Sequence, residues 1–409
     1  MKDPFLAAMC LALTAAAGLH AEECGEVPSA QESAEAPAPG SPHLEYAPGR
    51  GLLFRTSDGL FEASLGFNLQ VRYAHLDNDA SAGGVDADQF RVRRFKLSLA
   101  GYAWDPRLTY RFQAAFENSG DARLLDDAWL NYRFDDAFAL QGGQYKTPFT
   151  REEPMNDGVL QFAERAAVVE AFKPSRDIGA MVQGSFAKGL LAYQAGVFGG
   201  AGQSTTRTTS HVMPVLRLVA NPLGSIGTGE PDLEGHASPA LSLGANGFLN
   251  TLTKIDDTAF ETAVPNYVGK SGWLGRGISL FQTGEDVRIK SWGFDAQLKW
   301  RGLFAQAEYL VGQAEGLTSG GRLYAYGWYG EAGYLLLPRR LDVALRYSWV
   351  DANRNVARDS VGEVTAALDY YVHAHNFKLQ LDYVRTHRQR TTGAPANDQT
   401  FLIQAQLMP

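Results

Sequence analysis

The sequence predicts an all-β protein, a transmembrane antiparallel β-barrel of about 16 strands. Three observations predict this fold: apolar residues alternate with polar ones over long segments, the connections alternate between short and long, and tryptophans and tyrosines gather toward the segment ends. The chain has 409 residues, of which 45% are apolar and 20% are charged. That length fits one large β structure as well as roughly two or three soluble domains.

The alternation is clearest in residues 61–73, where every second residue is apolar or aromatic and the residues between are polar or glycine. A helix does not give this period, whereas a strand does. The pattern recurs in residues 108–117, 341–351 and 377–384. These segments reach about ten residues, the length that a tilted strand needs to cross the hydrocarbon layer, and soluble strands usually have only about five or six.

The connections between the segments alternate in length. Short turns are predicted at residues 104–107, 135–137, 188–189, 301–302, 338–340 and 374–376. Longer loops are predicted at residues 75–90, 150–176, 199–210, 251–287, 351–362 and 387–399. Short periplasmic turns that alternate with long external loops are typical of outer-membrane barrels. Residues 221–238 depart from this order, because a short turn is expected there.

The N-terminus predicts export. Residues 1–21 have Lys2, an apolar run that is too short to span a bilayer, and a small-residue end near Ala21, which together indicate a signal peptide. Residues 22–50 are rich in proline and alanine and predict a periplasmic linker. The barrel domain is then expected over residues 51–409, in the outer membrane of a Gram-negative-type cell.

Charge and composition exclude other classes. The formal net charge of −8 argues against a general nucleic-acid binder, since such a protein needs a basic surface. The only cysteines, Cys10 and Cys24, precede the barrel, so it has no cysteine to bind a metal. A barrel of about 16 strands leaves an aqueous lumen. We therefore expect passage of solute, with no enzyme activity and no cofactor.

The densest cationic run is FRVRRFK, residues 90–96. Arg94 and Lys96 share the lumen-facing parity, as does Arg72 on the preceding strand. Arg91 and Arg93 have the opposite parity, so they must lie at the outer rim or beyond a bulge that changes the register. We expect these side chains to converge near the mouth and attract anions. Alternatively, they grip lipopolysaccharide or pair with the acids of the adjoining loop, Asp77, Asp79, Asp86 and Asp88.

The loop at residues 150–176 is long and partly helical in pattern. A loop of this length inside a barrel can fold inward and narrow it. Its predicted constriction bases are Arg151, Arg165, Lys173 and Arg176. Acidic residues offset them, namely Glu152, Glu153, Asp157, Glu164 and Glu170. The predicted constriction is therefore mixed in charge.

Three stretches together carry a resemblance to a known family: the RVRR run at residues 91–94, GGQYKTPF at 142–149, and AER with SRDIG between 163 and 179. In this combination the chain resembles the phosphate-selective porin O and P family, well over residues 50–220 and more loosely beyond. The resemblance implies a homotrimeric outer-membrane channel with an inward-folded loop three. It also implies a ladder of arginines and lysines that guides phosphate-like anions.

Carried over residue by residue, the resemblance makes Arg72, Arg93 and Arg94 ladder arginines near the constriction and Lys146 a lysine beside the pore. Small anions would be the permeants, and outer-membrane lipids and lipopolysaccharide the surroundings. Arginine suits the role because its planar guanidinium donates several hydrogen bonds to phosphate oxygens. Two features depart from the family pattern: the acidic loop residues, and Pro409 in place of a terminal aromatic residue.

Three functions stay open at this point. The first is an anion-preferring porin, with phosphate or polyphosphate as the sharpest form. The second is a general or cation-tolerant diffusion porin on the same barrel. The third is an outer-membrane platform for adhesion or for hydrolysis. The long loops contain no set of nucleophile, base and orienting residue, which disfavours hydrolysis.

Overall fold

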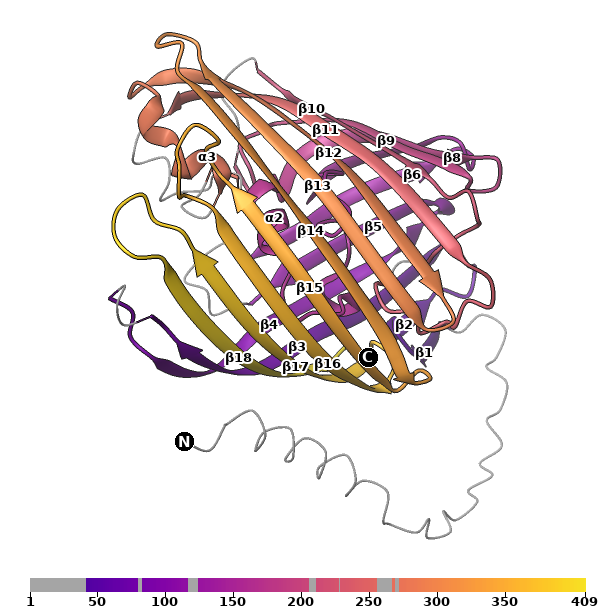
Figure 1. The fold of residues 1–409 in the computed structure, drawn as a ribbon. Coiled ribbons are helices and arrows are strands. Elements are labelled where there is room, and N and C mark those ends of the chain that lie inside the picture. Colours follow the sequence, from indigo (N-terminus) through magenta and orange to yellow (C-terminus); the bar gives the residue numbers. More distant parts are fainter. Residues whose placement is uncertain are drawn as a thin grey trace. The chain divides into compact units, whose positions relative to one another are not determined.

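The computed structural model is a closed antiparallel β-barrel (Figure 1). It describes residues 42–79, 83–116, 124–205, 211–227, 229–255, 267–268 and 272–409. Within these residues, strands β3 to β18 form the 16-stranded wall, and the pairing of β18 with β3 closes it. The predicted fold class and strand number are confirmed.

The strands of the wall follow one another in chain order, each paired with the next. They are β3 (Phe61–Asp77), β4 (Ala87–Ala103), β5 (Asp105–Ala115), β6 (Leu125–Arg133), β7 (Ala139–Lys146), β8 (Arg176–Phe186), β9 (Leu191–Phe198), β10 (Met213–Ala220), β11 (Ala240–Ile255), β12 (Glu285–Trp300), β13 (Leu303–Gly316), β14 (Arg322–Leu337), β15 (Leu341–Asp351), β16 (Val361–His373), β17 (Phe377–Arg388) and β18 (Ala396–Leu407). In the described part of the loops there are four short helical turns: η2 (Asp157–Val159), α2 (Ala167–Phe172), α3 (Trp273–Arg276) and η4 (Ile278–Leu280).

The wall turns its apolar side chains outward. In β3, Leu65 and Val71 are exposed, whereas Gln70 and Arg72 are buried inside. This arrangement is the reverse of a soluble sheet and is the one that a lipid solvent requires. The alternation in the sequence correctly predicted both faces. No helix among the described residues is long and apolar enough to cross a membrane.

The predicted boundary between the linker and the barrel domain, at residue 50, lies too far along the sequence. Residues His43–Ala47 of the predicted linker form β1, which pairs with β2 (Gly51–Arg55), and β2 pairs in turn with β3. The segment HLEYA lies between Pro42 and Pro48 and alternates like a strand, so it can extend the sheet although its flanks are rich in proline. Residues 1–41 lie outside the described residues, so the signal peptide and the rest of the linker stay predictions.

The predicted turns and loops lie near the strand ends, but some bounds differ: β5 already begins inside the predicted turn 104–107, and β4 begins inside the predicted loop 75–90. The long connection at residues 221–239 joins β10 to β11 on the side of the short turns. It folds into the barrel, where the Glu230 carboxylate accepts a hydrogen bond from the Gln161 N–H at 2.6 Å. The Glu230 N–H also donates to the carbonyl oxygen of Val159. Through these two hydrogen bonds the connection contacts the third external loop from the periplasmic side.

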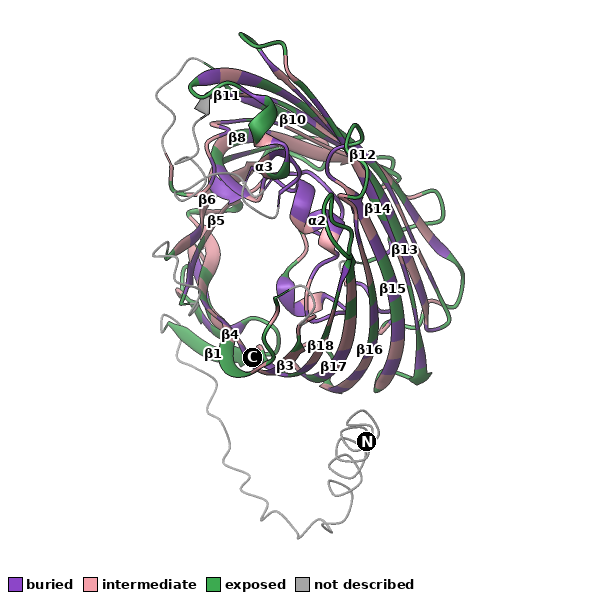
Figure 2. Cartoon of the chain, turned by 60° about the vertical axis from the view of Figure 1, so that its left-hand side comes forward, coloured by how far each residue is buried: buried purple, intermediate pink, exposed green. Residues whose placement is uncertain are grey.

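One side of the interior is filled by the loops. Figure 2 shows α2 and α3 inside the ring of strands. Phe172 of α2 stacks on Trp273 of α3, with ring centroids 5.9 Å apart, and both rings are buried. A Cβ on Gly312 of β13 would lie 2.6 Å from the Trp273 ring, so the close approach of α3 to the wall requires glycine there. The opposite side of the interior, along β4 to β9, is not filled by these helices.

Candidate functional site: a cationic passage along strands β3 to β9

The third external loop, residues 147–175, is anchored to the wall opposite the passage. Arg151 Nε lies 2.6 Å from Asp295 Oδ1 of β12, and the Ala163 N–H donates to Asp382 of β17 at 2.8 Å. The Val168 N–H donates to the hydroxyl of Ser348 on β15. These bonds join one side chain and two backbone N–H groups of the loop to buried polar side chains of the wall, which fixes the loop inside the barrel.

Three adjoining cavities run along the unfilled side. The external chamber lies between loop three and strands β4 to β8, and it shares Lys96, Lys146, Asp157 and Arg176 with a central cavity. The central cavity shares Lys96, Arg111 and Trp129 with a periplasmic cavity. Their volumes are about 200, 270 and 490 Å³. A water molecule occupies about 30 Å³ of liquid, so each cavity holds several.

The external chamber is the most cationic part of this passage. Seven of its lining residues are basic: Arg93, Arg94, Lys96, Lys146, Arg165, Lys173 and Arg176. Four are acidic: Asp126, Glu153, Asp157 and Glu170. The lining therefore has a formal excess of three positive charges, in a chain whose net charge is −8. Charge of one sign along a low-dielectric wall raises the local concentration of counter-ions.

A β-bulge in β4 orients the arginines. Gln70 pairs with Arg94 and Val71 with Val92, so Arg93 is the extra residue between them. Beyond the bulge Arg91 pairs with Arg72, which restores the inward parity. The bulge explains why the arginines of the RVRR run do not follow a single strand parity. It is one of the two alternatives that the sequence predicted.

The three ladder arginines meet on one carboxylate of loop three. Glu164 lies 2.5 Å from Arg72 Nη1, 2.6 Å from Arg93 Nε and 3.1 Å from Arg94 Nη2. The three guanidinium groups hold the pKa of Glu164 well below its ordinary value, although burial opposes this. Glu164 is therefore ionised, and its side chain is about one third exposed. It occupies the position between the three guanidinium groups.

Asp157 plays the same part deeper in the passage. Its carboxylate lies 2.7 Å from Lys96 Nζ and 2.6 Å from Arg165 Nη1. Lys146 Nζ is 3.9 Å away, and Arg94 Nε is 3.5 Å away. These cations hold the pKa of Asp157 well below its ordinary value against the effect of burial. Lys96 also lies 3.1 Å from Asp126 and lines all three cavities.

The two adjacent glutamates of loop three have opposite surroundings. Lys173 Nζ lies 3.0 Å from Glu153, and with Arg165 and Lys146 it lowers the pKa of that carboxyl to about 2 despite burial. Glu152 is buried on the filled side, and burial together with Glu230 raises its pKa to about 8. Of these two glutamates, only Glu153 therefore contributes a negative charge to the passage at neutral pH.

Two of the predicted residues do not line the passage. Arg72 is 1% exposed and is held by Gln404, Glu164 and the Ala163 carbonyl oxygen, so it fixes loop three to β3. Arg151 is buried against Asp295 and Ser242 on the opposite wall, so it anchors the loop there. The predictions that Arg72 and Arg151 line the pore were therefore wrong. Strand parity at Arg72 and loop membership at Arg151 do not reveal which part of the wall loop three covers.

The remaining predicted residues lie together. Arg93, Arg94, Lys96, Lys146, Arg165, Lys173 and Arg176 all line the external chamber. Arg176 is the first residue of β8 rather than part of the loop, and it binds Asp127 at 2.7 Å. The sequence-based selection missed Arg111 of β5, which lies 3.5 Å from Asp127 in the central cavity. Its inward parity in the segment LTYRFQ was the signal that could have identified it.

Comparisons with known proteins agree with this architecture. The sequence model of the family described as phosphate-selective porin O and P matches residues 64–408. An uncharacterized protein of Caulobacter vibrioides is 27% identical over 297 residues, which cover 69% of this chain and 55% of that protein. Porin O of Pseudomonas aeruginosa is 24% identical over 311 residues, which cover 70% of this chain and 67% of that porin. The chain thus spans between about half and two thirds of these relatives.

Solved structures share the fold. The anion-selective porin from Comamonas acidovorans matches with a TM-score of 0.56 at 10% identity, covering 85% of this chain and 100% of that one. The trimer form of OmpT, an outer membrane protein of Vibrio cholerae, matches with a TM-score of 0.55 at 11% identity, covering 85% and 99%. At such identities the likeness shows the fold alone. The family match over most of the barrel goes further: the chain belongs to the phosphate-selective porin O and P family and is a porin of the outer membrane.

Proposed function

We propose that the chain is a passive diffusion channel that prefers small anions, with phosphate-like anions as its permeants. The observation that carries this proposal is the formal excess of three positive charges around the external chamber. An anion that enters the external mouth would meet Arg93 and Arg94 first and Lys96 next. Partial exchange of its hydration shell for these donors would let it cross the narrow part, driven by its concentration gradient.

The acids in the wall keep binding weak. Each basic side chain of the chamber already contacts a carboxylate or carbonyl oxygen, such as Glu164 at Arg93 and Asp157 at Lys96. A passing anion must compete with these fixed partners, which lowers its affinity and shortens its stay. Conduction requires this balance, because an ion that binds tightly cannot leave. The mixed charge supports fast passage of anions rather than their storage.

The basic side chains continue beyond the chamber. Arg111 lines both the central and the periplasmic cavity, and Arg50 lines the periplasmic one. Arg50 pairs there with Glu62. A permeant anion would thus find a cation at each stage of its path. The channel is proposed to work as a homotrimer among outer-membrane lipids and lipopolysaccharide.

A general or cation-tolerant porin is the second candidate. The observation that favours it is that acidic side chains also line the chamber and the central cavity, including Asp126, Asp127 and Asp157. If the fixed ion pairs stay closed during conduction, the basic side chains are not available to a passing anion, and the channel discriminates less between anions and cations. The two candidates differ in whether phosphate competes with a smaller anion for the same donors.

The test is block of chloride current by phosphate. Purified wild-type protein in a planar bilayer would carry chloride from KCl, and inorganic phosphate would be added to one side. We expect chloride conductance to fall in a saturable way at millimolar phosphate or below, since doubly charged oxyanions bind guanidinium groups more strongly than chloride does. A conductance that changes only with bulk ionic strength would contradict the proposed function and favour the general porin.

A further inference from the structure

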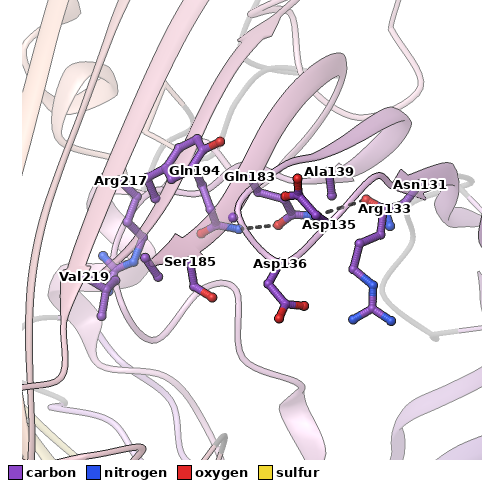
Figure 3. A pocket seen from close by; sticks show the side chains of 13 residues that line it. Asn131, Arg133, Asp135, Asp136, Ala139, Gln183, Ser185, Gln194, Arg217 and Val219 are labelled. Atoms are coloured by element: carbon purple, nitrogen blue, oxygen red, sulfur yellow. Dashed lines mark hydrogen bonds between the residues drawn. The ribbon is translucent and has the colours of Figure 1, made fainter. Parts of the chain in front are cut away.

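A fourth cavity lies beyond the central cavity, on the wall formed by β6 to β10. It has a volume of about 330 Å³ and shares Gln183 and Gln194 with the central cavity. Figure 3 shows the side chains of Asn131, Gln183 and Gln194 in a row across this wall. We call Asn131, Gln141, Gln183 and Gln194 the amide row. A solute that leaves the cationic chamber along β6 to β9 passes directly over it.

The amide row is built by strand register. Asn131 pairs with Gln141 across β6 and β7, and Gln183 pairs with Gln194 across β8 and β9; all four line cavities of the lumen. Gln194 Nε2 donates to Gln183 Oε1 at 3.3 Å, and Gln183 Nε2 donates to Gln141 Oε1 at 3.1 Å. The bond between Gln194 and Gln183 is longer than an ordinary N–H···O bond, so a solute can replace it at small cost. Within the described residues, Gln194 Oε1 accepts no hydrogen bond from the protein.

The chemistry of the row differs from that of the chamber before it. Each amide offers both donors and an acceptor. The lining of the fourth cavity has no excess of positive charge, because Asp135 and Asp136 offset Arg133 and Arg217, so it attracts an inorganic anion less than the chamber does. A hydroxyl group donates and accepts, so it can bind to both ends of an amide. The row therefore suits a solute that carries hydroxyl groups.

The central cavity places charged and uncharged recognition side by side. Lys146 and Arg176 line it together with Gln141, Gln183 and the ring of Trp129. The cations would hold an anionic group of an organic solute, and the amides would bind its hydroxyl groups. The indole ring of Trp129 would pack against its apolar C–H face. Such a combination of a few polar groups with an aromatic surface is typical of sites for small organic ligands. Inorganic phosphate would use only the first of the three.

We infer that the preferred permeants are polyhydroxylated organic anions, with a sugar phosphate as the representative ligand. This inference rests on the proposed function, since it assigns the anionic group of the sugar phosphate to the same basic side chains. It adds that the amide row, with Trp129, selects the hydroxylated part. Two additional hydrogen bonds in a partly aqueous lumen strengthen binding by about tenfold.

The test compares two blockers of chloride current in a planar bilayer at pH 8, where both are mainly dianions: glucose 6-phosphate and inorganic phosphate. In the wild type, glucose 6-phosphate is expected to block at a concentration about tenfold lower than inorganic phosphate. Neutral glucose is expected to block weakly. Gln183→Ala and Gln194→Leu should each reduce the advantage of glucose 6-phosphate and leave the block by inorganic phosphate unchanged.

Gln389→Ala is the matched control, because Gln389 is an exposed amide in an external loop. In this variant glucose 6-phosphate should still block at a concentration about tenfold lower than inorganic phosphate. Unaltered KCl conductance would show that each variant forms its pore. Two results would overturn the inference: equal half-blocking concentrations of the two compounds in the wild type, or a stronger block by glucose 6-phosphate that persists in both amide-row variants. In either case, block by inorganic phosphate would still support the proposed function. Absence of block by either compound, with potassium-selective current, would overturn both.

Discussion

Lys96→Glu is expected to abolish the anion preference of the channel and to weaken its block by inorganic phosphate by at least about tenfold. Lys96 lines all three cavities of the passage, so every permeant passes it. The substitution lowers the formal excess of positive charge in the external chamber from three to one. It also leaves a third carboxylate beside Asp126 and Asp157, which Lys96 now binds at 3.1 and 2.7 Å.

The size of this effect follows from electrostatics. A unit charge about 4 Å from a permeant interacts with it by roughly 1 to 4 kcal/mol between the limits of bulk water and a protein surface. The measurement is the chloride-to-potassium permeability ratio, taken from the reversal potential in a KCl gradient. Lys188→Glu is the control, because Lys188 lies exposed in a periplasmic turn and its substitution changes the net charge equally. A permeability ratio that falls equally in both variants would refute a local role for Lys96.

Glu164→Gln is expected to strengthen the block by phosphate about tenfold. In the wild type the Glu164 carboxylate contacts three arginines, and it competes with any anion for Arg93 and Arg94. A neutral amide of the same shape would not neutralise the positive charge of these guanidinium groups, so they would attract phosphate more strongly. The block by phosphate should then deepen while its rate of release falls, which single-channel recordings resolve as longer closures.

Loop three should keep its place in this variant. Arg72 retains its bonds to Gln404 Oε1 and to the Ala163 carbonyl oxygen, and the Ala163 N–H retains Asp382. Glu315→Gln is the matched control, because Glu315 is an exposed acid at the end of β13 that pairs with Arg322. Weaker block in Glu164→Gln than in the wild type would mean that Glu164 orients the arginines for the anion instead of competing with it.

The barrel was predictable from the sequence because the membrane imposes a strict pattern. Lipid on one face and water on the other force the period of two that residues 61–73 display, and the turn lengths follow from the topology. The β1 strand was missed since proline-rich flanks hid five alternating residues, His43–Ala47. The inward fold of residues 221–239 was equally hidden, because its contacts with Val159 and Gln161 join distant parts of the chain.

The candidate site was predictable in composition but less so in arrangement. Parity placed Lys96 inward correctly, and the conflict at Arg93 correctly indicated a rim position or a bulge. Parity alone could not show that loop three would cover Arg72, because this depends on where the loop crosses the lumen. For the same reason Glu164 was read as one of several offsetting acids, although its contacts with three arginines make it their shared counter-ion.

The most direct test of the proposed anion preference is the reversal potential of the wild-type channel in a planar bilayer across a KCl gradient. The excess of basic side chains around the external chamber predicts a reversal potential close to the equilibrium potential of chloride. Raising the ionic strength should move it toward zero as the wall charges are screened. A reversal potential near that of potassium would contradict the account, because it would mean that the acids of the wall dominate the passage.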